Sequence, residues 1–174
     1  MSKQFSLFYN PKSEVLVTVG ASEAIDIAIR SIIDPGDEVI IIEPTFVSYA
    51  PIVELAGGVP VSVGTRKEDQ FKVTPHQIEA AVSEKTKLVM LCFPNNPTGA
   101  VMSKEELELI ASVIKKHDLL VLSDEIYAEL SYDLQHFSIA RLADMRERTI
   151  VISGFSKAFA MTGWRLGFTL APED

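Results

Sequence analysis

The sequence has a single cysteine, Cys92, which rules out an intramolecular disulfide and a metal site built from clustered thiolates. It lacks any apolar run near the roughly 18–20 residues that a membrane helix requires, and no secretory-type apolar stretch follows the polar start MSKQFS. Basic residues are scarce, because 16 Lys and Arg face 24 Asp and Glu and leave a formal net charge of -8. Nucleic acids and anionic membranes demand a basic surface, so we expect neither as a partner. Because membrane and secretory segments are lacking, we expect a cytoplasmic protein, and we expect no metal site.

Short apolar segments alternate with amphipathic ones along the whole chain. With 174 residues and 47% hydrophobic content, the chain can bury one sizeable core in one domain. The apolar segments are mostly rich in leucine or β-branched residues, as expected of strands that are buried on both faces. The predicted strands cover residues 15–19, 38–42, 59–63, 88–92, 119–122, 150–152 and 166–170.

Helix signals lie between these strands. The sequences TPHQ at 74–77 and SKEE at 103–106 both match a capping box, and a helix over 24–33 follows the first strand. The turn sequences DPGD at 34–37 and AGG at 56–58 return the chain to the sheet. This alternation predicts an α/β fold, with a mostly parallel seven-stranded sheet and helices on both of its faces.

Polar segments follow most of the predicted strands, namely GASEA, EPTF, FPNNPTG, SDEIY and SGFSKAFAMTGWR. In open parallel sheets, ligands bind just beyond the carboxyl ends of the strands. We therefore expect these segments to meet at one edge of the sheet and to form a binding site there.

Gly20, Ala21 and Ser22 stand where the first strand turns into a helix, and free backbone N–H groups at such a turn can bind a phosphate. A plain turn capped by Ser22 is the alternative. The segment lacks the Lys-Ser/Thr of a nucleotide P-loop and the repeated glycines of a dinucleotide fold, which disfavours ATP and NAD as ligands.

Asp124 ends the apolar run LLVLS, and a carboxylate at the rim of a low-dielectric sheet requires a cationic partner. Tyr127 faces the same cavity if the chain makes a helical turn at this point. The alternative is that Asp124 caps the segment EIYAEL and that Tyr127 packs in the core.

Lys157 lies in SGFSKAFAMTG, a segment poor in charge and rich in small residues, which predicts a lysine in a crowded and partly dry cavity. Desolvation lowers the pKa of a lysine amine and suits it to Schiff-base chemistry. Arg165 has forked donors suited to a phosphate dianion, whereas Trp164 is expected to pack. Ordinary surface roles are the alternative for both charged residues.

Asn96 lies in the turn PNNPTG and can donate to a ligand oxygen, although a turn alone also explains this sequence. Phe46, in EPTFVSY, can lay its ring on a flat ligand or belong to the core.

One ligand, pyridoxal phosphate, has a part for each of these groups. Its phosphate suits the helix N-terminus and Arg165, its ring nitrogen suits Asp124, and its aldehyde suits Lys157. Its phenolic oxygen suits Asn96 and Tyr127. We therefore expect this cofactor at the sheet edge.

The segments VTVGASEAI, DPGDEVI, EPTFVSY, FPNNPTGAV, SDEIY and SGFSKAFAMTGWRLG resemble, in order and spacing, the class I/II aminotransferases of pyridoxal-phosphate fold type I. The resemblance covers roughly residues 14–174 and leaves 1–13 unassigned. It implies an enzyme that transfers an amino group between an L-amino acid and a 2-oxo acid, and that is a homodimer in the full-length family.

The resemblance also implies residue roles. It makes Lys157 the Schiff-base lysine and proton shuttle, Asp124 the partner of the pyridinium nitrogen, and Tyr127 a catalytic residue on the phenolic oxygen. The cofactor-binding residues that it implies are Ala21, Ser22, Phe46, Asn96, Asp124, Tyr127, Ser156, Lys157 and Arg165.

Compared with the family, the chain is expected to be truncated to the large cofactor-binding domain at 14–174, without an N-terminal arm or a C-terminal small domain. We therefore expect cofactor binding with little turnover, and self-association through uncovered apolar surface. Two alternatives stay open, a carbon–sulfur β-lyase of the same fold and a non-catalytic binding domain.

Overall fold

A seven-stranded sheet forms the centre of the computed structural model, with the strand order β1-β7-β6-β5-β4-β2-β3. The structure describes residues 7–132 and 134–173. The strands are β1 (Val15–Val19), β2 (Glu38–Glu43), β3 (Val59–Gly64), β4 (Thr86–Cys92), β5 (Leu120–Asp124), β6 (Thr149–Gly154) and β7 (Leu166–Leu170). Every strand predicted from the sequence is therefore present.

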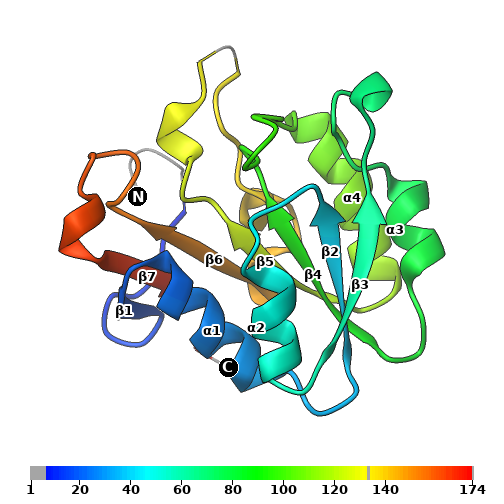
Figure 1. Ribbon diagram of the computed structural model, residues 1–174, viewed down its shortest axis with the longest axis horizontal. Helices are drawn as coiled ribbons and strands as arrows, with labels where there is room; N and C mark the ends of the chain where they lie inside the picture. The colour runs from blue at the N-terminus through cyan, green and yellow to red at the C-terminus, as the bar shows by residue number, and fades with distance from the viewer. Residues whose placement is uncertain (1–6, 133, 174) are drawn as a thin grey trace.

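Helices cover both faces of this sheet (Figure 1). Helices α1 and α2 pack on one face, against side chains such as Ile41 and Met90, and α3 and α4 pack on the other, against Ile40 and Val89. Neighbouring residues of a strand point to opposite faces, so β2 and β4 are buried on both sides. The helices are α1 (Ala21–Ile32), α2 (Tyr49–Leu55), α3 (Pro75–Ala81) and α4 (Lys104–Lys116), with short 3-10 helices at Lys67–Asp69, Ala128–Leu130, Ile139–Arg141, Arg146–Arg148 and Thr162–Trp164.

Both predicted capping boxes are confirmed. The Thr74 hydroxyl accepts a hydrogen bond from the Gln77 N–H at the start of α3, and Ser103 does the same for Glu106 at the start of α4. In each box the side chain of the third helical residue also accepts from the N-cap backbone N–H. These bonds satisfy donors that the helix itself leaves free.

Helix α1 begins at Ala21, earlier in the chain than predicted. Gly20 is its N-cap with φ of 80°, a conformation that glycine adopts without steric cost. Ser22 lies inside the first turn and does not cap the helix, so the alternative of a turn capped by Ser22 is wrong.

Strand direction places the chain segments around the sheet edge. Within the described sheet, β7 alone runs against its neighbours, antiparallel to both β1 and β6, while the other pairs are parallel. The carboxyl ends of β1 to β6 therefore share one edge. Because β7 begins at that edge, Arg165, the residue before it, lies there too.

Apolar surface remains uncovered at the β1 end of the sheet. Leu7 and Tyr9, ahead of β1, are buried against Val151 and Leu170, but Val17 is 66% exposed. Self-association through such surface stays a prediction. No helix among the described residues is long and apolar enough to cross a membrane.

The close approach of β7 to α1 requires glycine at position 167. A Cβ on Gly167 would lie 2.5 Å from the Ala21 nitrogen, closer than packed atoms tolerate. We expect Gly167→Ala to lower the free energy of unfolding by about 1–3 kcal/mol, measured by urea denaturation. Gly163→Ala is the control, because a Cβ there meets no neighbouring heavy atom within 4 Å. Equal losses in the two variants would contradict this account.

Candidate active site

A cavity of about 220 Å³ opens at the sheet edge where the strands end. A buried water needs roughly 10–15 Å³, so this space is suited to a ligand. Every site residue predicted from the sequence lines the cavity: Ala21, Ser22, Phe46, Asn96, Asp124, Tyr127, Ser156, Lys157 and Arg165. The structure adds Ile25, Tyr49, Cys92, Ile126 and Thr162 to that lining.

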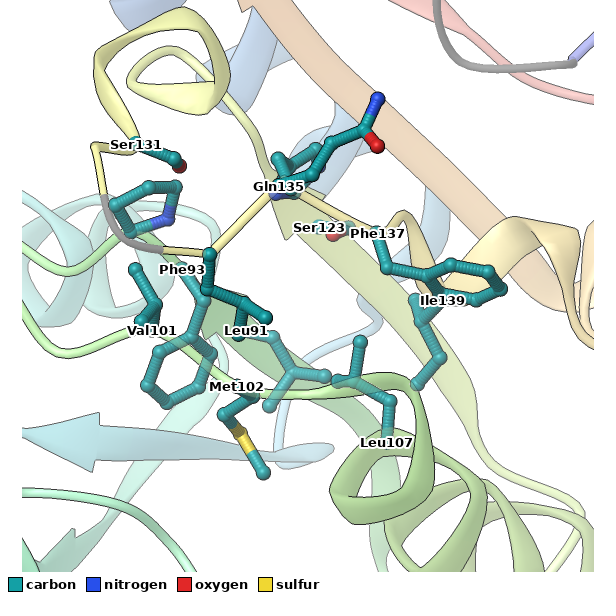
Figure 2. A pocket seen from close by; sticks show the side chains of 13 residues that line it. Leu91, Phe93, Val101, Met102, Leu107, Ser123, Ser131, Gln135, Phe137 and Ile139 are labelled. Carbon is teal, nitrogen blue, oxygen red and sulfur yellow. The ribbon is translucent and has the colours of Figure 1, made fainter.

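A second, smaller pocket lies on the opposite face of the sheet, beside α4 (Figure 2). Apolar side chains such as Leu91, Met102 and Leu107 surround it, and Ser123 is among its few polar groups. Its volume of about 20 Å³ holds roughly one water. The small pocket therefore has no room for a cofactor or an amino acid.

The α1 end of the cavity presents backbone N–H donors and a guanidinium. Ala21 and Ser22 form the first turn of α1, whose N-cap makes no side-chain hydrogen bond, so backbone N–H groups there are free to meet an anion. Arg165 donates to the Ser156 hydroxyl over 3.5 Å and to the Thr162 carbonyl over 3.1 Å. Among the described residues, its guanidinium has no carboxylate partner within ion-pair distance.

The backbone directs Arg165 toward α1. Arg165 has φ of 50° and ψ of 50°, the left-handed region that a non-glycine residue seldom occupies. A Cβ at Gly20 would collide with the Arg165 guanidinium. The absence of a side chain at Gly20 thus leaves the space that the guanidinium fills beside the helix N-terminus.

Asp124 is the last residue of β5 and is 4% exposed. Its Oδ2 accepts a hydrogen bond of 2.6 Å from the Tyr49 hydroxyl, and its Oδ1 accepts one of 3.1 Å from the Ile126 N–H. Burial raises the pKa of Asp124 from 3.8 to about 6, against the effect of these two donors. No cation pairs with it among the described residues, so the predicted cationic partner is not supplied by this part of the chain.

Tyr49 and Cys92 are site residues that sequence reasoning missed. Tyr49 is the first residue of α2 and is 1% exposed, and burial raises the pKa of its phenol well above the ordinary range. Cys92 pairs with Asp124 in the β4–β5 register, and burial raises the pKa of its thiol to about 12. Tyr49 stands in an apolar run, and no local signal shows that it reaches a carboxylate 75 positions away.

Lys157 and Tyr127 lie together at the cavity. The Lys157 ammonium is 5.7 Å from the centre of the Tyr127 ring, and burial raises the pKa of the Tyr127 phenol. The predicted dry setting of Lys157 is wrong, because the residue is exposed. Trp164, predicted to pack, is 73% exposed. Both errors have one cause, since the described residues leave much of the segment between β6 and β7 uncovered, including these two side chains.

Asn96 and Phe46 reach the cavity from two loops. The Asn95 side chain accepts from the Thr98 N–H over 3.1 Å and builds the turn, which leaves Asn96 to line the cavity. Phe46 packs edge-on against Tyr49, with ring centroids 5.8 Å apart, and also lines the cavity. The turn and the ligand-facing interpretations of these segments are therefore compatible.

Comparison with known proteins decides the family. Residues 2–174 match the family model for aminotransferase class I and II. The chain belongs to the class I and II aminotransferases. This family depends on pyridoxal phosphate, and the match includes most of the segment 1–13 that the sequence motifs left unassigned.

Aminotransferase relatives share both sequence and structure with the chain. YugH of Bacillus subtilis, whose description is no more specific than aminotransferase, is 62% identical over 173 residues, which are 99% of this chain and 45% of YugH. The aspartate aminotransferase of Pyrococcus abyssi is 48% identical, with the same shares covered. The crystal structure of an aromatic aminotransferase from Pyrococcus horikoshii superposes with a TM-score of 0.97 and 48% identity, over 99% of this chain and 46% of that one. This aminotransferase chain thus spans less than half the length of these relatives.

The buried charge of Asp124 predicts a pH-dependent stability in this aminotransferase chain. The folded-state pKa is raised, so its contribution to stability is fully present below about pH 4 and is lost as the pH rises through about 6. Asp124→Asn removes this loss and should raise the free energy of unfolding at pH 8 by about 1–3 kcal/mol in the absence of added cofactor.

Urea denaturation from pH 4.5 to 8 measures this effect, with the gain shrinking as the pH falls. Glu84→Gln is the control, because Glu84 is exposed and forms no ion pair with the described residues. A gain that does not vary with pH would show that relief of buried charge is not its cause.

Proposed function

We propose that this chain is the cofactor-binding part of an aminotransferase, and that Lys157 bonds to the aldehyde of pyridoxal phosphate. One observation carries the proposal. Asp124, Lys157 and Arg165 line a single cavity. Among the described residues, the buried Asp124 carboxylate has no cationic partner, and the Lys157 and Arg165 side chains have no carboxylate partner. A ligand that carries one positive and one negative group could pair with both kinds of charge in this cavity.

The residues at the α1 end fit the phosphate of this cofactor. Free N–H groups of the first helical turn, the hydroxyls of Ser22 and Ser156, and the Arg165 guanidinium supply donors of suitable charge. We assign these residues and Ala21 to phosphate binding. The missing Cβ of Gly20 keeps the cradle open to the guanidinium.

The remaining lining residues suit the ring. We assign Asp124 to the ring nitrogen, where its negative charge stabilises a protonated nitrogen. We assign Asn96 and Tyr127 to the phenolic oxygen, to which they would donate, and Phe46 to the face of the ring. The support for these assignments is that each side chain lines the same cavity.

The chemistry follows from these positions. When bound, the cofactor supplies an electron-withdrawing ring that stabilises negative charge at the α-carbon of an amino acid. Once an amino acid has displaced Lys157 from the aldehyde, the freed Lys157 Nζ would hold the proton of that α-carbon as a general base and then release it as a general acid. Tyr127 orients the Lys157 amine, which lies near its ring. The proposed substrates are an amino acid and a 2-oxo acid, while the homodimer and the cytoplasmic location stay predictions.

Reductive labelling tests the proposal. We expect borohydride to fix one pyridoxyl phosphate per chain at low cofactor excess, and peptide mass spectrometry to place it on Lys157. Lys157→Ala should abolish this stoichiometric label, whereas Lys85→Ala, at an exposed lysine, should retain it. Labels scattered over surface lysines and unaffected by Lys157→Ala would refute the assignment.

Turnover by the 174-residue chain should be poor. The basic side chains that line its cavity, Lys157 and Arg165, are both assigned to the cofactor, so no basic side chain among the described lining residues is left to pair with a substrate carboxylate. We expect kcat/KM for any amino acid and 2-oxo acid pair to fall at least about 100-fold below that of a relative of full length. Comparable turnover by the purified chain would contradict this proposal.

A further inference from the structure

Tyr49 holds Asp124 through the most deeply buried polar contact of the cavity. The hydroxyl of Tyr49, 1% exposed, donates to Oδ2 of Asp124, 4% exposed, over 2.6 Å. Because the Ile126 N–H occupies Oδ1, both carboxylate oxygens have a fixed donor. The plane of the carboxylate is therefore set before any ligand arrives.

We infer that Tyr49 is a positioning residue that orients Asp124 and weakens its basicity, so that a proton shared with the cofactor's ring nitrogen stays on the nitrogen. This inference rests on the proposed function and assigns a role to a residue outside the predicted site. A donated hydrogen bond stabilises the ionised form of a carboxylate and makes it a poorer proton acceptor. A protonated ring nitrogen withdraws electrons more strongly than a neutral one.

The phenol is a dependable donor because burial keeps it protonated. Burial raises the pKa of Tyr49 well above the ordinary range, so the hydroxyl does not ionise at physiological pH. The pKa of Asp124, about 6, reflects burial acting against the Tyr49 and Ile126 donors. Without the Tyr49 hydroxyl, burial would raise the pKa of Asp124 further.

The other ionisable groups near Asp124 do not replace this donor. Cys92, across from it on β4, has a thiol whose pKa burial raises to about 12, so the thiol is neutral. The neighbouring Glu125 carboxylate raises the pKa of Asp124. Lys157 and Arg165 line the same cavity without pairing with Asp124. Tyr127 lines it as well, and β6 presents the apolar Ile152 beside Asp124 in the sheet register.

Carboxyl carbon NMR of aspartate-labelled chain, without cofactor, tests the coupling directly. Tyr49→Phe keeps the ring and removes the donor, and we expect the midpoint of the Asp124 titration to rise by about one pH unit or more. Tyr9→Phe is the matched control, because the Tyr9 hydroxyl is also buried but has no hydrogen-bond partner among the described residues. An unchanged midpoint in Tyr49→Phe, or an equal rise in Tyr9→Phe, would overturn the inference.

The unmutated chain offers a second measurement, should Tyr49→Phe fail to fold. The ζ-carbon resonance of Tyr49 should shift with the same midpoint as the Asp124 carboxyl, near pH 6. A Tyr49 resonance that stays flat from pH 4.5 to 8 would overturn the coupling. Neither titration needs the cofactor, so each is decided even if reductive labelling disproves the proposed function.

Nitrogen NMR of chain loaded with labelled pyridoxal phosphate tests the consequence for the ring. Tyr49→Phe should move the ring-nitrogen resonance toward the position of a neutral pyridine, while Tyr9→Phe leaves it in place. A resonance unchanged in Tyr49→Phe, alongside a raised Asp124 midpoint, would show that Tyr49 tunes the carboxylate without affecting the ring.

Discussion

Strand direction is the constraint on which the site depends. Strands β1 to β6 all point the same way, and the reversed β7 begins where they end. This arrangement brings the start of α1, Asp124, Lys157 and Arg165 to one edge, although they are spread over most of the chain. A parallel β7 would begin at the far edge and would carry Arg165 away from the α1 end of the cavity.

Electrostatics then separate the two ends of the cavity. The α1 end presents helix N–H groups and a guanidinium, while the β5 end presents a carboxylate in a nearly dry setting. Burying that carboxylate opposes folding, and its raised pKa is the sign of this cost. Functional sites commonly keep groups that a purely stable fold would avoid. The hydrogen bond from Tyr49 moderates the cost without supplying an opposite charge.

Sequence patterns predicted the parts of this structure that depend on local chemistry. Runs of apolar residues located the strands, and the capping boxes at Thr74 and Ser103 located two helix starts. The gathering of the predicted site residues around one cavity followed from fold topology and family resemblance. The early start of α1 depends on the backbone of Gly20, and the Tyr49 contact crosses 75 positions, so neither leaves a local pattern. The exposure of Lys157 and Trp164 depends on what covers a loop, which composition does not reveal.

Lys157 is an exposed residue of this chain. Under the proposed function, its end of the cavity would therefore offer little steric choice among small aldehydes. Selection would then come from the opposite end, where an aldehyde that also carries a dianion would gain the donors of α1 and Arg165. The proposed site would thus select its cofactor by the phosphate group more than by the aldehyde.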